Sequence, residues 1–260
     1  MALQLGQAVS DGIGRILTKT GGILLAGLLA IQLVTQAAVN TAVIGYLPPE
    51  VAGRFGESAG LVLPLPAEAG VALLAATLLA SSVYFVALSR ALARPARELA
   101  SFPAELLTRR VGRATLSMVV GGFVVSIAVT LGFAALFFPG IFLAASFLFF
   151  VFAVGVEDEG TIGALKRSWA LARGNRLKLA LLVVLSGGIG GMVGAVGSVL
   201  DLVGLGLASE VAVSVVTSVL FTALYGVIAA AYLQLRDDSP GGSGGSVTAD
   251  PIDASSTPEL

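Results

Sequence analysis

The feature that most constrains this chain is a series of six apolar stretches, each long or nearly long enough to cross a lipid bilayer. A bilayer core about 30 Å thick needs roughly 20 residues of helix, in which every backbone N–H and C=O is paired within the segment. No Asp, Glu, Lys or Arg lies inside any of the six stretches, which run over about 23–44, 69–88, 116–138, 141–156, 179–200 and 211–233. They predict an all-α fold, a polytopic transmembrane helical bundle of six spans in a membrane domain of residues 1–236.

Composition supports this class and excludes others. The chain is 56% hydrophobic and 12% charged, with a mean hydropathy of +0.96, which is outside the range of globular proteins in water. It has no Cys and no His, so disulfides, thiolate nucleophiles, the commonest metal ligand and the commonest general base are missing. A net charge of −1 gives no field to attract nucleic acid. We therefore expect no enzyme activity, no catalytic, cofactor or metal site, and no nucleic-acid partner.

Proline positions predict how two of the connections are built. The third and fourth stretches are separated by Pro139-Gly140, a pair that stops a helix and turns the chain, so they form a tight hairpin. The loop after the first stretch contains Pro48-Pro49, Pro64 and Pro66, which favour extended turns there over another helix.

The distribution of Lys and Arg orients the spans. Short loops that stay in the cytoplasm carry these residues, and fourteen of the fifteen lie in the N-terminal segment, the second and fourth loops and the tail. The opposite side has Arg54 together with five acids: Glu50, Glu57, Glu68, Asp201 and Glu210. We therefore expect a multi-pass protein of the cytoplasmic membrane with both termini inside, which requires an even number of spans.

A cleaved signal peptide is the alternative interpretation of the first span, because Arg15 and Lys19 precede an apolar run that reaches Ala37 and Ala38. That run is longer than the usual signal core of about 7 to 15 residues. Cleavage would also leave five spans, against the charge distribution. The uncleaved span is favoured.

Short helices are predicted on the inner membrane surface before three of the spans. Over 161–173, Ile162, Leu165, Trp169 and Ala172 recur at three- and four-residue spacing, which indicates an amphipathic interfacial helix. Weaker patterns precede the first span (Leu5, Val9, Ile13, Ile16) and the third (Leu99, Phe102, Leu106, Leu107). Three such helices, each followed by a two-span hairpin, would make a threefold repeat. The basic and aromatic residues of these segments are candidates for contact with anionic lipid headgroups: Arg109, Arg110, Arg113, Lys166, Arg167, Trp169, Arg173 and Arg176.

Two charged clusters have alternative interpretations. The Arg-rich second loop could clamp a phosphate, although membrane topology alone requires positive charge there and is favoured. Glu157, Asp158 and Glu159 could bind a divalent cation, but they precede a helix whose dipole attracts negative charge, and that interpretation is favoured.

After Arg236 the chain is an acidic Gly/Ser tail, residues 237–260, which is expected to be disordered. Its acids, and three Lys against twelve Arg in the whole chain, suit a halophilic source.

The segment 156–176 carries a family resemblance. Its pattern, VEDEG followed by ALKRSW, LARGNR and a new span, resembles the membrane domain associated with glycerophosphoryl diester phosphodiesterases, and uncharacterised six-span proteins of haloarchaea. The 63–66 segment, Arg90 and Pro139 are similar to the haloarchaeal group. The resemblance implies a six-span α-helical membrane fold without an activity to transfer, since the phosphodiesterase barrel is absent.

Three faces within the spans are candidate functional features. Gln32, Gln36 and Asn40 share one face of the first span, and Ser214, Ser218 and Thr222 form a stripe in the sixth that could face it. They could line a polar path, but hydrogen bonding between helices is favoured for both. In the fifth span a glycine face predicts close packing on a neighbouring helix or a second subunit, in preference to a hinge: Gly187, Gly190, Gly191 and Gly194.

The leading hypothesis is a non-enzymatic membrane-domain or accessory protein that contacts anionic lipid or protein partners, including a second copy; the alternative is a permease or lipid-handling transporter.

Overall fold

The expected all-α fold with six long apolar helices is confirmed. A computed structural model describes residues 3–101 and 103–237, and in that part of the chain the regular elements are α-helices and two short 3-10 helices. Six segments are long and apolar enough to cross a membrane: α2 (Lys19–Tyr46), α4 (Ala67–Leu92), α5 (Val111–Ala135), α6 with α7 (Phe137–Gly155), α9 (Arg176–Leu202) and α10 (Gly206–Asp237). The expected tail lies almost wholly outside the described residues.

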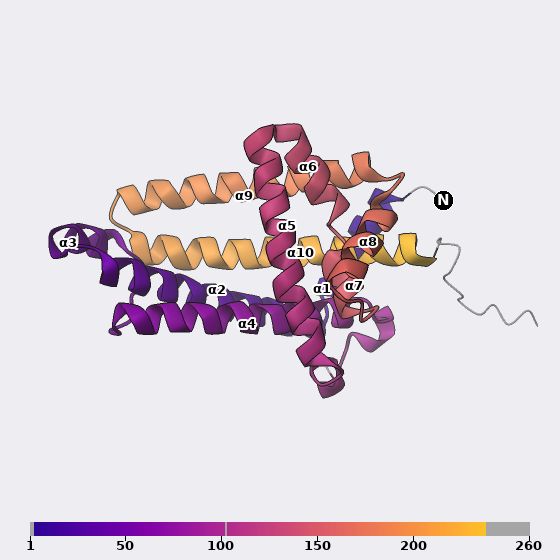
Figure 1. Ribbon diagram of the computed structural model, residues 1–260, viewed down its shortest axis with the longest axis horizontal. Helices are drawn as coiled ribbons and strands as arrows, with labels where there is room; N and C mark the ends of the chain where they lie inside the picture. The colour runs from indigo at the N-terminus through magenta and orange to yellow at the C-terminus, as the bar shows by residue number, and fades with distance from the viewer. Residues whose placement is uncertain (1–2, 102, 238–260) are drawn as a thin grey trace, which may run out of the picture.

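The long helices do not all run in one direction. In Figure 1, α2, α4, α9 and α10 extend along the long axis, whereas α5 crosses over α10 and α4 and returns through α6. Helix α2 packs on α4, and α9 and α2 both pack on α10. The first and last described helices meet at the same end of the molecule, where α1 (Leu5–Ile16) lies against α10.

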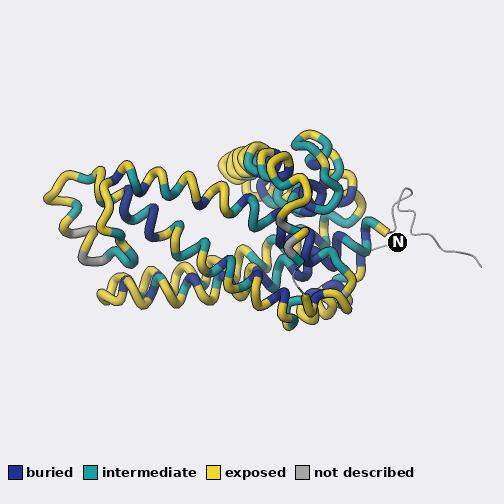
Figure 2. The backbone as a smooth tube through the Cα atoms, turned by 90° about the horizontal axis from the view of Figure 1, so that it is seen from below, coloured by how far each residue is buried: buried dark blue, intermediate teal, exposed yellow. Residues whose placement is uncertain are grey.

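Buried side chains are concentrated at the end where the first and last helices meet, as the dark blue tube in Figure 2 shows. The largest fully buried residues there come from α4, α10 and the segment around α7, and the Tyr232 ring stacks on Phe152 with 5.2 Å between centroids. Elsewhere the helices are open: only 6% of the apolar window of α9 and 17% of that of α5 is buried within the chain. In a membrane, lipid tails would cover these surfaces.

The turn of the second hairpin was placed wrongly by the sequence. The break lies at Leu136, whose backbone is extended, and Pro139 and Gly140 are inside α6 (Phe137–Ser146). Proline is tolerated in the first turn of a helix because its missing N–H would have no partner there. A second interruption separates α6 from α7 (Phe150–Gly155), so the fourth span is two short helices.

A buried serine compensates for that second interruption. Ser168 of α8 (Thr161–Ala172) is fully buried; its Oγ accepts from the Phe149 N–H at 3.2 Å and donates to the Ser146 carbonyl at 2.9 Å. Backbone groups freed by a broken helix inside a membrane protein need such partners, because hydrocarbon offers none. The fourth span is therefore completed by a side chain from the next helix.

The expectation of extended turns in the first external loop was also wrong. The loop contains a ten-residue helix, α3 (Pro49–Ser58), with Pro49 at its first position, where the fixed φ of proline suits a helix start. Beyond it, the chain reaches α4 through the proline-rich 59–66 segment, and Thr41 of α2 holds that segment by accepting from the Leu63 N–H at 2.9 Å.

The three segments expected on the inner surface fold differently from one another. Helix α1 buries Ala8 and Gly12, while Val9 and Ile13 of the expected apolar stripe are exposed. Helix α8 buries Ala164, Ser168, Leu171 and Ala172, and Ile162 of the expected apolar stripe is exposed. The third segment forms two 3-10 helices, η1 (Ala96–Glu98) and η2 (Ala104–Leu107), each preceded by a proline; Phe102 lies outside the described residues.

Candidate functional site

The segments that carry most of the Lys and Arg gather at one end of the long helices, which we call the basic end. It is formed by α1, the start of α2, the end of α4, η1, η2, the start of α5, α8, the start of α9 and the end of α10 (Figure 1). Contacts of α4 with η2 and α7, and of α8 with α7 and α10, hold these segments together.

A buried arginine organises the basic end. The Arg90 side chain, on the last turns of α4, is 7% exposed and donates to three acceptors: the Gly155 carbonyl at 2.8 Å, the Leu106 carbonyl at 3.1 Å and Oδ1 of Asp158 at 3.0 Å. Asp158 has a left-handed backbone with φ +53° and also pairs with Arg109. One guanidinium thus joins α4, η2 and the turn after α7.

The neighbouring carboxylate joins two more helices. Glu157 accepts from Arg167 Nε of α8 at 2.8 Å and from the Tyr232 hydroxyl of α10 at 2.7 Å. Glu157 and Asp158 therefore form ion pairs across helices, and neither lies in the first turn of α8 as a dipole partner. These pairings support a structural role for the acidic turn over the divalent-cation interpretation.

A second arginine has donors without a partner. Arg176, at the start of α9, places its guanidinium carbon 4.3 Å from the centroid of Trp169 and 4.7 Å from that of Phe142. Its Nε and Nη2 atoms are buried, and neither has a hydrogen-bond partner. A guanidinium within cation–π distance of two rings is well oriented, and a guanidinium suits a carboxylate or phosphate as its partner.

Arg15 has a different part in the basic end. From α1 its Nη1 donates to the carbonyls of Leu92 and Arg94, both at 2.7 Å, and so satisfies backbone acceptors at the end of α4. Burial lowers the pKa of the Arg15 guanidinium, and the charge of Asp11 opposes that shift. The group stays protonated, since arginine does not lose its proton in proteins.

The other predicted headgroup residues lie at the surface of the basic end. Arg167 is half-buried by its pair with Glu157, and Trp169 is 36% exposed beside Phe142 and Phe147. The exposed members are Arg109, Arg110, Arg113, Lys166 and Arg173. The structure brings Trp169 and Arg176 together, but it does not bring all eight residues into one cluster.

Part of the polar face of α2 lies at the opposite end of the molecule, which we call the acidic end. Gln36 and Asn40 of α2 line a chamber of about 260 Å³ with residues of α9, α10 and the 59–60 segment. The Ser214, Ser218 and Thr222 stripe of α10 does not line the same chamber. These three residues are buried, and the hydroxyls of the last two have no hydrogen-bond partner. Gln32 is half-buried on α2 and does not line the chamber.

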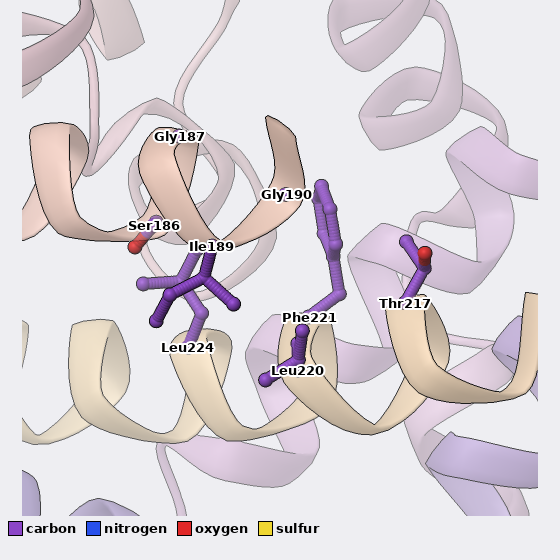
Figure 3. A pocket seen from close by; sticks show the side chains of 8 residues that line it. All are labelled: Ser186, Gly187, Ile189, Gly190, Thr217, Leu220, Phe221 and Leu224. Atoms are coloured by element: carbon purple, nitrogen blue, oxygen red, sulfur yellow. The ribbon is translucent and has the colours of Figure 1, made fainter. Parts of the chain in front are cut away.

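The glycine face of α9 is open within this chain. A Cβ added at Gly187, Gly190, Gly191 or Gly194 would meet nothing within 4 Å. Gly187 and Gly190 border an apolar groove of about 310 Å³ with the ring of Phe221 of α10 (Figure 3). Among the described residues these four glycines therefore do not make the predicted close packing on a neighbouring helix, and packing on a second subunit stays a prediction.

Comparison with known proteins gives a family without an activity. Residues 3–235 match a domain of unknown function, DUF7847. The chain belongs to this family. No curated protein and no solved structure matches it. The DUF7847 domain includes the six apolar helices, both ends described above and nearly all of the described residues.

Two residues of the DUF7847 domain escaped the sequence analysis. In the sequence Arg90 has a part only in the charge distribution and the family resemblance, and Glu210 only in an acidic loop, whereas Glu210 lies in the second turn of α10. Glu210 is four residues before Ser214, so it extends the stripe of Ser214, Ser218 and Thr222 by one helical turn. That register is the signal that could have identified it.

Proposed function

We propose that the DUF7847 domain is a non-enzymatic, multi-pass protein of the cytoplasmic membrane that binds anionic lipid headgroups at its basic end. The observation that carries this proposal is the Arg176 guanidinium, whose carbon lies 4.3 Å from the Trp169 ring centroid and 4.7 Å from that of Phe142, with two buried nitrogens that have no partner among the described residues. A lipid phosphate bound beside this guanidinium would neutralise its charge, and an indole ring is suited to the depth where aromatic residues meet headgroups.

The surrounding charges support the same function. Exposed Arg173 and Lys166 lie close in sequence to Arg176, and each basic residue near an anionic surface contributes about 1 kcal/mol of attraction. The segment's resemblance to the membrane domain of glycerophosphoryl diester phosphodiesterases, and to haloarchaeal six-span proteins, belongs to this proposal, in which the domain acts as an accessory unit in a lipid membrane.

The orientation is part of the proposal. With the basic end in the cytoplasm, α1 and the end of α10 both lie inside, as the gathering of Lys and Arg at one end favours. A protease-cleavable tag after residue 260 tests this in intact cells and in inverted vesicles. Protection in cells and cleavage in inverted vesicles is the expected result.

The single tryptophan makes lipid binding directly measurable. Trp169 is the only Trp of the chain, so bromine-labelled lipids that reach Arg176 quench one defined fluorophore. We expect brominated phosphatidylglycerol to quench more strongly than brominated phosphatidylcholine at low salt, and the difference to shrink as salt is raised.

Two variants make this measurement specific. Arg176→Gln should bring the quenching by the two lipids to the same level, because the unpaired donors are lost. Lys166→Gln removes one exposed charge from the same helix as Trp169 and should reduce the difference without abolishing it, because each basic residue contributes about 1 kcal/mol. Equal quenching by both lipids in the unaltered protein, or an unchanged preference in Arg176→Gln, would refute the proposal.

A permease or lipid-handling transporter is the second candidate function, and the polar chamber at the acidic end favours it. Because the chain has no Cys, single cysteines at Gln32, Gln36 and Asn40 can be labelled without background. Gln36 and Asn40 border the chamber, so Gln32 is the discriminating position. Labelling at Gln32 by a membrane-impermeant reagent supports a path deeper into the membrane, and protection there counts against transport.

A further inference from the structure

The chamber at the acidic end is lined by three helices and is large enough for a molecule of several heavy atoms. Its volume is about 260 Å³, whereas one water needs roughly 10–15 Å³ of such space. Its polar lining comes from α2, the end of α9 and the start of α10: Gln36, Asn40, Ser198, Asp201, Ser209 and Glu210. It lies at the far end of the long helices from Arg176, so it is independent of the proposed lipid contact.

Glu210 is held in place from one side only. Its Oε2 accepts from the Leu61 N–H at 2.8 Å and from Nδ2 of Asn40 at 3.3 Å. The backbone of Gly60 lies so close to this carboxylate that residue 60 has no room for a side chain. The other oxygen, Oε1, is buried and has no hydrogen-bond partner. A carboxylate removed from water without its full set of donors is costly, and a positive charge in the adjoining chamber would lower that cost.

The other lining groups offer acceptors. The Ser209 hydroxyl donates to the Gly197 carbonyl at 2.9 Å, and the Ser198 hydroxyl donates to the Gly194 carbonyl at 3.1 Å. Their protons are used within the chain, so their oxygens present lone pairs. Nδ2 of Asn40 is also occupied, by the Leu61 carbonyl at 3.1 Å and by Glu210. Asp201 adds a second carboxylate, and no Lys or Arg is among the described residues of the lining.

A chamber with negative charge and acceptors selects a ligand with positive charge and donors. We propose that it binds a small organic ammonium cation, which the carboxylates of Glu210 and Asp201 attract and whose N–H groups donate to the accessible oxygens of the lining. The apolar part of the ligand would lie along the glycine wall of α9, where Gly194 leaves open space.

The test measures thermal stabilisation of the full chain in detergent by three solutes of matched size: butylammonium, 1-butanol and butyrate. Circular dichroism reports unfolding, and Trp169 fluorescence gives a second signal at the opposite end of the molecule. We expect saturable stabilisation by butylammonium alone. No stabilisation by butylammonium, or an equal effect of butanol, would overturn the proposal. If Na⁺ or Ca²⁺ stabilises the protein and butylammonium does not, the proposed ligand class would be overturned.

Three variants assign any binding to this chamber. Glu210→Gln keeps the shape and removes the charge, and should weaken butylammonium binding at least tenfold. Glu50→Gln, on exposed α3, is the matched control at the same end and should bind as the unaltered protein does. Gly194→Leu should abolish binding by filling the chamber. A Cβ at residue 194 meets nothing within 4 Å, so this variant should fold. It therefore tests whether the ligand binds in the chamber even if Glu210→Gln does not fold. Retention of binding by Gly194→Leu would overturn the assignment.

Discussion

Replacing Arg90 with methionine should destabilise the fold more than any change to an exposed arginine. The variant loses hydrogen bonds to Gly155, Leu106 and Asp158, and leaves a carboxylate that is 12% exposed without its buried partner. Removing one member of a buried ion pair costs about 3–5 kcal/mol. Asp158 still has its ion pair with Arg109, whose side chain is 69% exposed. We therefore expect a loss in the free energy of unfolding at the lower end of this range, about 3 kcal/mol.

Equilibrium unfolding in mixed micelles, with increasing dodecyl sulfate and detection by circular dichroism and Trp169 fluorescence, measures this loss. Arg97→Gln, at an exposed position of η1, is the matched control. Arg90→Lys should lie between the two, because an ammonium keeps the charge but lacks the planar fork that reaches three acceptors.

A double-mutant cycle with Asp158→Asn isolates the ion pair from the two carbonyl contacts. A coupling energy between about 0.5 and 3 kcal/mol is expected for residues in one network. A loss below about 1 kcal/mol for Arg90→Met, or one equal to that of Arg97→Gln, would refute the view that this guanidinium organises the basic end.

Further predictions concern packing and hydrogen bonding. Gly12→Ala should lower stability by about 1–3 kcal/mol, because its Cβ would lie 2.5 Å from the Val227 nitrogen of α10, whereas Gly6→Ala on the same helix, with open space, should not. Tyr232→Phe should cost about 1 kcal/mol by removing the hydroxyl bond to Glu157, measured by the same unfolding assay. Gly191→Ala should raise stability by up to about 1 kcal/mol, since its Cβ meets nothing in this chain; a loss of stability together with a smaller oligomer on size exclusion would show that a second copy packs there.

The long helices could be predicted because their cause is local. A helix that enters hydrocarbon must be apolar over about 20 residues whatever its neighbours are, so hydropathy alone locates it. The helices extend beyond the apolar windows: α10 begins at Gly206 and includes Glu210. The windows end at charged residues, whereas a helix ends where its backbone loses partners, as at Leu136 before α6.

The candidate sites depend on contacts between distant segments, and these the sequence could not supply. Whether the fourth span is one helix or two depends on Ser168, which lies in the next helix. The sequence favours the acidic turn as a partner of the α8 helix dipole. The structure shows instead that Arg90 pairs with Asp158 and that the Tyr232 hydroxyl donates to Glu157. The crossing of α5 over α10 has no counterpart in the hydropathy pattern, because lipid-facing and helix-facing apolar residues are chemically alike.

The contact between α1 and α10 also has a consequence for biosynthesis. The Gln4 N–H donates to Oε1 of Gln234, a partner that is made 230 residues later. At translation rates of about 5–20 residues per second, the first helix waits roughly 10 to 50 s for its docking site. The final span thus completes the docking of α1, and chains that end before residue 226 should leave this helix undocked.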